Sequence, residues 1–375
     1  MASLRRLSLS AFRNIEQADL RLQAGTNVFY GANGSGKTSL LEAVHLLASG
    51  RSFRSRLLQS VVQEGKAGLT VFGELESGLT LGVQKQLGGG SRIHINQVPA
   101  TSSSQLATSL PLQVIHSESF AALNGGPGVR RRLLDWTVFH VEHRFMEVWK
   151  RYQVALRQRN ALLRQGRVDV GLLSLWEQRL AESGTEVDQL RTGVYSRLSA
   201  ETAGLLEQLE ESPLRRIVMS YRRGWKKDRP LAEALRDSRD ADMAQGFGRS
   251  GPHRADLHFS VGGEAAHNIL SRGQQKMLVC VLRAAMAAVV RREGEKPLFL
   301  IDDLPAELDQ DNQLQFAQWI SRCAAQVVVT GIDGDITSRP WRRLESPWNQ
   351  PAMFHVEHGH INSRPEMGSQ VERSD

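Results

Sequence analysis

The eight residues GANGSGKT, Gly31 to Thr38, constrain the fold more than any other part of the chain. They fit the pattern G-x-x-x-x-G-K-[ST] in full, follow the apolar run TNVFY, and precede apolar residues at helical spacing from about Lys37. Glycines let backbone N–H groups turn toward phosphates, and a helix N-terminus adds positive potential. Lys37 would supply a charge to the β- and γ-phosphates, and Thr38 a hydroxyl for Mg²⁺. The pattern predicts a nucleotide-binding loop between a strand and a helix. The residues expected to contact the nucleotide are Gly31, Ala32, Asn33, Gly34, Ser35, Gly36, Lys37, Thr38 and Ser39.

Two adjacent carboxylates follow a second apolar run, PLFLI. Its residues 298–301 predict a strand buried on both faces, and Asp302 comes where such a strand presents ligands. We expect Asp302 to hold Mg²⁺ with Thr38, directly or through water. Asp303 has two interpretations: it orients or deprotonates an attacking water, or it only caps the following segment. The expected catalytic residues are Lys37, Asp302 and Asp303, for phosphoryl transfer to water.

A second helix start carrying glycine lies at Ser271–Arg272–Gly273–Gln274. Apolar residues at helical spacing follow it, so the four residues lie at a predicted helix N-terminus. Such a terminus can bind an anion, but a serine there is also an ordinary N-cap. The segment alone does not decide between the two.

The positive charge of the chain is concentrated in one segment. Residues 129–167 contain ten arginines and lysines but three acids, an excess equal to the formal net charge of +7. The segment is either a solvated helix face or a contact for phosphates, and the lack of balancing acids favours DNA backbone binding with little sequence preference. The candidates are Arg130, Arg131, Arg132, Arg144, Lys150, Arg151 and Arg157. A second basic cluster, Arg222, Arg223, Lys226, Lys227 and Arg229, surrounds Trp225.

The order of predicted elements divides the chain into four parts. Strands are expected over residues 3–30, hairpins over 69–99, a loop over 100–109, helices over 127–212, and buried strands again after about 246. The expected domains are an N-terminal part of an α/β head (1–118), an inserted helical arm (119–245), a C-terminal part of the head (246–361) and a disordered tail (362–375). Two cysteines, no signal peptide and no membrane-spanning stretch favour a reduced cytoplasmic protein.

The order of these motifs, with ELD after the paired aspartates, resembles the ABC-type ATPases of the SMC class. Several segments resemble the bacterial RecF family within it: SFRS, LNGGPGVRRRLLDWTVFHVE, GPHRADL, LSRGQQKMLVCVLRAA, LIDDLPAELD and MFHVEHGHI. The resemblance implies a P-loop ABC-type head, with a mixed or parallel sheet, flanking helices, a β-rich lobe and an inserted arm. It makes Gly31–Thr38 the Walker A motif, Asp302 and Asp303 the Walker B motif, and Asp309 the D-loop aspartate. Ser271–Gln274 would be a signature that contacts the ATP of a partner subunit.

The resemblance also implies a function. A member of this family would form a homodimer with ATP and Mg²⁺, bind duplex DNA at single-strand gaps or junctions, and reset by slow hydrolysis. It would help to load RecA on strands coated by single-strand-binding protein, with RecR and RecO as partners. An SMC-like DNA tether would need a longer insertion, and an ABC-transporter subunit would need a switch histidine, where the chain has Gly331-Ile332-Asp333. A P-loop kinase would leave the signature and D-loop segments unexplained.

Overall fold

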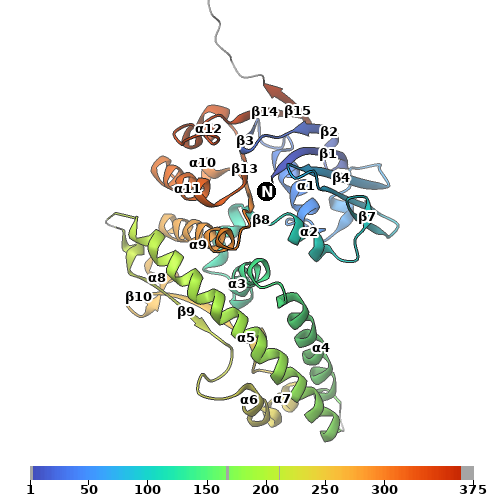
Figure 1. Cartoon of the computed structure of the whole chain (residues 1–375), viewed down its shortest axis with the longest axis vertical. Helices are drawn as coiled ribbons and strands as arrows, with labels where there is room; N and C mark the ends of the chain where they lie inside the picture. Colours follow the sequence, from blue (N-terminus) through green and yellow to red (C-terminus); the bar gives the residue numbers. More distant parts are fainter. Residues whose placement is uncertain (1–2, 166–168, 211, 365–375) are drawn as a thin grey trace, which may run out of the picture. The chain divides into compact units, whose positions relative to one another are not determined.

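The computed structural model describes residues 3–165, 169–210 and 212–364. The chain forms two compact units (Figure 1): unit 1 comprises Met1–Phe120 and Val290–Asp375, and unit 2 comprises Ala121–Val289. The first boundary lies close to the expected one at 119. Unit 2 continues to Val289, beyond the expected end of the arm at 245, so the predicted signature segment belongs to unit 2.

Unit 1 contains a mixed sheet with the strand order β15-β14-β3-β13-β12-β8. Strands β14, β3, β13, β12 and β8 are parallel, and β15 is antiparallel to β14. Every side chain of β12 and β13 is buried, as their unbroken apolar runs predicted. Their bounds are β3 Gly25–Tyr30, β8 Leu112–Ile115, β12 Leu298–Ile301, β13 Gln326–Gly331, β14 Ala352–Glu357 and β15 His360–Arg364. Helix α12 (Gly334–Arg342) contacts β3 and β13, α10 (Leu304–Glu307) contacts β13, and α11 (Gln310–Cys323) packs against both helices (Figure 1).

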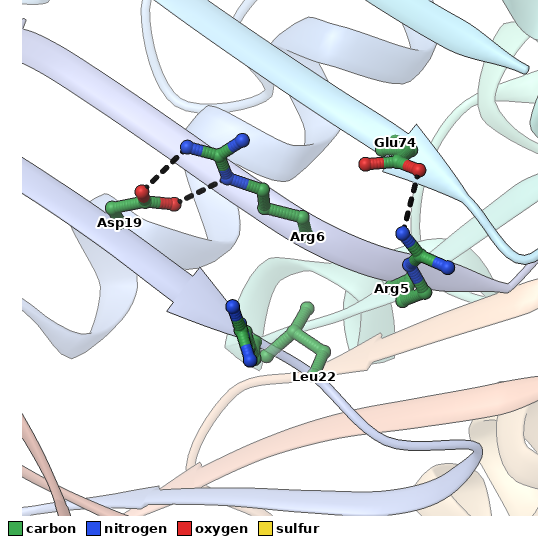
Figure 2. A pocket seen from close by; sticks show the side chains of 6 residues that line it. Arg5, Arg6, Asp19, Leu22 and Glu74 are labelled. Carbon is green, nitrogen blue, oxygen red and sulfur yellow. Dashed lines mark hydrogen bonds and ion pairs between the residues drawn. The ribbon is translucent and has the colours of Figure 1, made fainter. Parts of the chain in front are cut away.

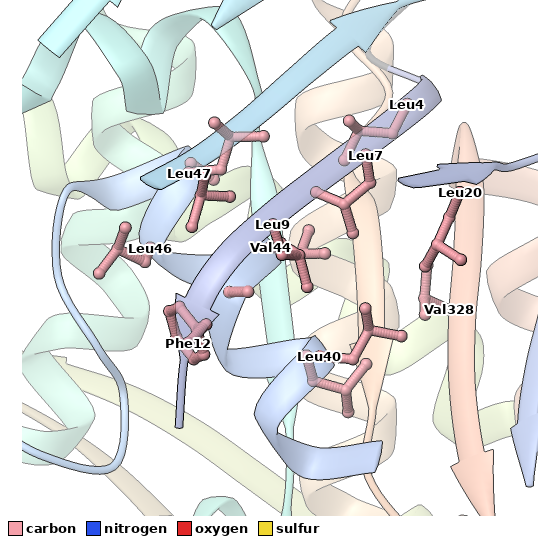
Figure 3. Packing of buried hydrophobic residues seen from close by; sticks show 14 of the residues in the cluster. Leu4, Leu7, Leu9, Phe12, Leu20, Leu40, Val44, Leu46, Leu47 and Val328 are labelled. Atoms are coloured by element: carbon pink, nitrogen blue, oxygen red, sulfur yellow. The ribbon is translucent and has the colours of Figure 1, made fainter. Parts of the chain in front are cut away.

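An antiparallel sheet, β2-β1-β4-β5-β6-β7, forms the β-rich lobe of unit 1. Its strands are β1 Leu4–Phe12, β2 Ile15–Arg21, β4 Gly68–Leu75, β5 Thr80–Gln86, β6 Ser91–Ile95 and β7 Val98–Pro99. Leu7 and Leu9 of β1 pack with Leu40 and Val44 of α1 (Lys37–Ser49), as Figure 3 shows. Each fully buried leucine contributes roughly 1.5–3 kcal/mol. This core therefore fixes the helix that begins at Lys37.

The expectation of a loop over residues 100–109 is wrong, because α2 spans Ser103–Ser109. The Gln105 side chain accepts hydrogen bonds from the backbone N–H groups of Thr101 (2.9 Å) and Ser102 (3.4 Å), and Leu106 is fully buried. Serine and threonine favour helix N-termini as well as loops, so composition alone gave the wrong element here.

Unit 2 contains the predicted helices, α3 Pro127–Val141, α4 Phe145–Leu163 and α5 Val170–Glu207. Helices α4 and α5 run side by side (Figure 1). The arm is not purely helical as expected, since β9 (Ile217–Arg222) pairs with β10 (Asp256–Val261), and β10 with β11 (Glu264–Ala265). Unit 2 also contains the short α-helices α6 Leu231–Asp237, α7 Arg239–Gln245 and α8 Ala266–Ile269.

Helix α9 (Arg272–Arg292) is the one described helix with the length and apolar composition to cross a membrane. Of its most apolar window, 67% is buried inside the structure, as in the core helix of a globular protein. Near the C-terminus, strand β15 continues to Arg364. Residues 362–364, expected in a disordered tail, are therefore part of a strand, and residues 365–375 lie outside the described residues.

Candidate functional site

The predicted phosphate loop connects β3 to α1 and has the backbone conformation that glycine permits. Gly31 has φ +151°, and a Cβ there would lie 2.1 Å from the carbonyl oxygen of Val356 on β14. The Lys37 ammonium donates hydrogen bonds to the carbonyl oxygens of Gly31 (2.8 Å) and Ala32 (2.9 Å). Burial lowers the pKa of Lys37, and the nearby Asp303 and Asp302 oppose that shift. The lysine charge is therefore held, partly desolvated, at the loop.

Asn14, which the sequence analysis did not identify, supports this loop from the turn between β1 and β2. Its Nδ2 donates to the carbonyl oxygen of Ser35 (3.2 Å), and its Oδ1 accepts from Ser39 Oγ (2.9 Å). The Oγ of Ser35 is buried and has no recorded partner among the described residues, so it is a polar group available to a ligand. No spacing rule in the sequence marks Asn14.

The predicted metal ligands lie in contact at the carboxyl ends of the parallel strands. Thr38 Oγ1 is 3.1 Å from Asp302 Oδ1 and 3.0 Å from Oδ2. Thr330 at the end of β13, also missed, donates from Oγ1 to Asp302 Oδ1 (2.7 Å) and accepts from the Asp303 N–H (3.1 Å). Carboxylate and hydroxyl oxygens are the ligand type that Mg²⁺ prefers, so this donor set fits that ion. Among the described residues no group of three or more His, Cys, Asp and Glu side chains could hold a metal.

Asp303 stands next to this pair with φ +50°, at the position preceding α10. Its side chain makes no capping hydrogen bond there, which leaves the capping interpretation without structural support. Burial raises the pKa of Asp303, and the negative charge of Asp302 raises it further, while Lys37 lowers it. A carboxylate with a raised pKa is a better proton acceptor than an ordinary aspartate.

Lys37, Thr38, Asp302 and Asp303 line one cavity of about 370 Å³ in unit 1. Three of its lining residues, Arg54, Ser117 and Glu307, were not expected. Arg54 belongs to the segment SFRS and is a second cation in the lining of the cavity. The full lining comprises Asn33, Gly34, Gly36, Lys37, Thr38, Ser39, Arg54, Ser117, Asp302, Asp303 and Glu307.

The predicted signature and D-loop residues both form helix N-caps. Ser271 Oγ accepts from the Gln274 N–H (3.3 Å), and Gln274 Oε1 accepts from the Ser271 N–H (3.0 Å), which is a reciprocal capping box. Asp309 caps α11 through the Asn312 N–H (2.9 Å). The ordinary capping role of Ser271 is thus present, and Ser271, Arg272 and Gly273 are also exposed.

Some cations of the basic segment 129–167 are buried and paired with acids, which its composition did not indicate. Arg130 makes two hydrogen bonds of 2.8 Å to the Asp256 carboxylate, and its side chain is only 14% exposed. Arg159 is fully buried against Glu177 (3.0 Å) and Asp242 (2.9 Å). These acids come from elements far along the chain, so a local count of charges misses them. The structure gives Arg130 and Arg159 structural roles.

Other cations of the segment remain on the surface of unit 2. Arg131 donates to the Ala255 carbonyl oxygen (2.6 Å) and is half-buried. Arg144 and Arg151 share the single carboxylate of Glu186, at 3.3 and 2.9 Å. Arg132, Lys150 and Arg157 are exposed.

Another hollow, of about 650 Å³, lies on the β-rich lobe of unit 1 (Figure 2). Arg6 pairs with Asp19 and Arg5 pairs with Glu74, at 2.7 and 2.9 Å. The hydrogen bond from Arg6 lowers the pKa of Asp19. Both acids that line the hollow are therefore already neutralised by arginines across the strands.

The phosphate loop after β3, the paired aspartates after the parallel strand β12 and the exposed helix N-terminus in an inserted unit define an ABC-type ATPase head. The family model described as RecF/RecN/SMC N terminal domain matches residues 3–343. The chain belongs to the RecF family: it is 42% identical to the DNA replication and repair protein RecF of Pseudomonas paraeruginosa over 98% of this chain and 100% of that one. Its identity to the protein of the same name from Pseudomonas entomophila is 44%, over 96% and 98% of the two chains. The resemblance seen in the sequence is confirmed.

Solved structures support the same fold. The structure described as the recombination mediator protein RecF-ATP in the RecFOR pathway matches with a TM-score of 0.83 and 22% identity, over 97% of this chain and 98% of that one. An Smc head bound to the C-winged helix domain of ScpA matches with a TM-score of 0.57 and 14% identity, over 97% and 98%. The predicted class, an α/β ATPase head with an inserted arm, is confirmed.

Proposed function

We propose that the chain binds ATP with Mg²⁺ in the cavity of unit 1 and hydrolyses it slowly. The observation that carries this proposal is the contact of Thr38 with Asp302 beside a loop whose carbonyl oxygens hold the Lys37 ammonium. Thr38 and Asp302 would hold Mg²⁺, which would neutralise charge on the β- and γ-phosphates. Relatives that bind ATP, by the description of the solved structure, support the same ligand.

In this proposal hydrolysis is transfer of the γ-phosphoryl group to water. Lys37 lies against the leaving phosphates, and its charge offsets the negative charge that develops there. Asp303 orients the attacking water and accepts its proton, a role that its raised pKa favours. Thr330 keeps Asp302 in place through its 2.7 Å hydrogen bond.

ATP would also hold two copies of the chain together. The exposed residues Ser271, Arg272 and Gly273 at the start of α9 offer the positive end of a helix dipole to an anion. We assign it to the γ-phosphate bound by a second subunit, with Asp309 at the same interface. Hydrolysis removes that phosphate and so releases the dimer.

The DNA role comes from the family, whose members are named DNA replication and repair proteins. We propose that the ATP-bound dimer binds duplex DNA at single-strand gaps or junctions in the bacterial cytoplasm. It would promote RecA loading on strands coated by single-strand-binding protein, with RecR as direct partner and RecO downstream. Of the predicted contacts, the exposed cations of α3, of α4 and of the residue that precedes α4 suit phosphate binding, and Arg130 does not. They are Arg132, Arg144, Lys150, Arg151 and Arg157.

Sedimentation of the purified chain with and without ATP-Mg²⁺ tests the dimer. We expect wild type to dimerise with ATP and Ser271→Arg to bind ATP as a monomer, because the new side chain blocks a helix terminus of unit 2 and leaves the Walker A residues of unit 1 unchanged. Ser196→Arg, which adds the same cation at an exposed position of α5, is the control and should still dimerise. Wild type that stays monomeric with ATP bound would contradict the proposal.

A further inference from the structure

A cavity of about 1000 Å³ in unit 2 has no role in the function described above. It is lined by α5, β9, the loop after β9, and β10. Two segments that stood out in the sequence meet at it: the basic cluster around Trp225, and the segment GPHR at 251–254 through Arg254. Residues distant in sequence thus build one site.

The backbone of the cavity is fixed by a close approach of two glycines. The Gly251 N–H donates to the Gly224 carbonyl oxygen (3.2 Å), and a Cβ on Gly224 would lie 2.3 Å from the Gly251 carbonyl oxygen. The fully buried Arg191 donates to the Pro252 carbonyl oxygen (2.7 Å). The loops are therefore held together before any ligand arrives.

Aromatic side chains form the walls of the cavity. The rings of Tyr195 and Tyr221 are 5.8 Å apart, and the Arg223 guanidinium lies 3.9 Å from the Trp225 ring centroid. The Tyr195 hydroxyl donates to the Met219 carbonyl oxygen at 2.8 Å, which fixes that ring. A flat apolar ligand would meet preformed stacking surfaces here.

The charges around these walls are unbalanced. Asp188 pairs with Arg223 at 3.1 Å, and Asp256 pairs with Arg130, so both acids of the lining are already neutralised. Three further cations of the lining are exposed and have no acidic partner recorded among the described residues. They are Arg222, Lys227 and Arg254.

We propose that this cavity binds a nucleotide of single-stranded DNA, with the base on the aromatic walls and the flanking phosphates on the three cations. A single strand fits, because bases in a duplex are stacked on each other and cannot reach an aromatic side chain. The inference rests on the proposed DNA function and extends it: unit 2 would sense the single-stranded side of a gap.

Fluorescence anisotropy with a labelled (dT)₁₂ oligonucleotide tests the site, in EDTA and without ATP, so that ATP-dependent dimerisation does not contribute. We expect Trp225→Ala to weaken binding by about tenfold or more, since each stacked base contributes that much to affinity. Trp225→Phe keeps a stacking ring and should stay within about threefold of wild type. Arg215→Glu removes an exposed cation of unit 2 outside the cavity and serves as the control for charge alone.

An abasic dodecamer separates stacking from backbone attraction. We expect it to bind wild type much more weakly than (dT)₁₂ and to be insensitive to Trp225→Ala. Equal binding of the two oligonucleotides, or an unchanged affinity in Trp225→Ala, would overturn the proposal. Displacement of (dT)₁₂ by oligoglutamate at equal concentration would also overturn it and assign the cavity to acidic peptides. Wild type that fails to dimerise with ATP but binds (dT)₁₂ through Trp225 would refute the ATP-driven dimer and leave this site standing.

Discussion

Asp303 shows how the candidate site combines strain with charge. Its backbone has φ +50°, a conformation that costs non-glycine residues about 1–3 kcal/mol, and its carboxylate lies beside that of Asp302. Both features oppose folding, and Asp303 lines the cavity that also contains Lys37. An arrangement that lowers stability and has no capping role is typical of a site kept for its chemistry.

The variant Asp303→Asn removes the proton acceptor and keeps the shape of the side chain. We expect the hydrolysis rate to fall by about 10²–10⁴-fold, with ATP binding retained, because general-base catalysis contributes about that much. Steady-state ATPase assays and equilibrium nucleotide binding measure the two effects. Asp311→Asn, an exposed change in the first turn of α11, is the control and should alter neither. Loss of ATP binding in Asp303→Asn would show that Asp303 holds the nucleotide instead.

The raised pKa of Asp303 also predicts how the stability difference between wild type and Asp303→Asn depends on pH. A carboxyl with a higher pKa in the folded state binds more protons when folded, so its contribution to stability falls as the pH rises through that pKa. Asp303→Asn should therefore unfold at a higher temperature than wild type at neutral pH, and the difference should shrink in acid. The hydrolysis rate of wild type should fall on acidification at a higher pH than an ordinary aspartate would give.

Gly31 and Gly34 of the phosphate loop differ in why each position favours glycine. At Gly31 a side chain would clash with a neighbouring strand, whereas at Gly34 only the positive φ disfavours one. Gly31→Ala places a Cβ against the Val356 carbonyl oxygen, and we expect a loss of at least about 3 kcal/mol in the free energy of unfolding, together with loss of ATP binding. Gly34 has φ +80° but open space around it, so Gly34→Ala should cost only about 1 kcal/mol. Chemical denaturation without nucleotide measures both. Equal losses would show that the β14 contact does not constrain the loop.

At this scale the sequence predicted the residues whose spacing is set by the chain itself. Lys37 and Thr38 follow from one continuous motif, and Asp302 follows from the end of a buried strand. Asn14 and Thr330 could not be predicted, because they reach the site only through the pairing of distant strands.

Helix α4 shows that charge must be counted in space and not along the chain. Ten cations against three acids in residues 129–167 indicated a free basic surface. Arg159 is nevertheless buried, with two acids from α5 and α7, whereas Lys150 and Arg157 of the same helix are exposed. Periodicity places Arg159 on the inward face only once the neighbouring helices are known.

This difference predicts two kinds of variant within α4. Arg157→Glu should weaken duplex DNA binding and reduce the slope of log affinity against log salt by about 0.9 for each phosphate that the side chain no longer neutralises. Arg159→Met should leave the slope unchanged and cost up to about 3–5 kcal/mol of unfolding free energy, because two buried acids each lose one of their two arginine partners. Salt titrations and denaturant melts measure the two. A reduced slope in folded Arg159→Met, or an unchanged slope in Arg157→Glu, would contradict the assignment of these faces.

Strands and helices with a clear pattern of apolar residues could be predicted from the sequence, whereas elements with a mixed pattern could not. The fully buried β12 and β13 were recognised from their unbroken apolar runs. Strand β9 was missed because it lies within a segment dominated by helices, and its exposed face begins with the apolar Val218, which breaks the alternation of apolar and polar residues. Its pairing with β10 depends on residues more than 30 positions away, which no local pattern encodes.

The whole chain is organised around an insertion. Unit 1 is assembled from two segments separated in sequence by all of unit 2, and its nucleotide residues come from both: Thr38 before the insertion and Asp302 after it. Ordering of the cavity therefore requires that both segments of unit 1 be folded together. We therefore expect the two segments of unit 1 to unfold in one cooperative transition, and nucleotide binding to stabilise that transition.

Scanning calorimetry of the full chain tests this organisation. We expect two unfolding transitions, one for each compact unit, and in the monomeric Ser271→Arg variant ATP-Mg²⁺ should raise only the transition of unit 1. At a nucleotide concentration one hundred times the dissociation constant, the added stability is about 2.7 kcal/mol. Lys37→Met, which removes the charge beside the phosphates, should abolish the shift without changing the other transition. Arg159→Met gives the opposite control, since it should lower only the transition of unit 2. A single transition that ATP moves as a whole would show instead that the two units unfold as one.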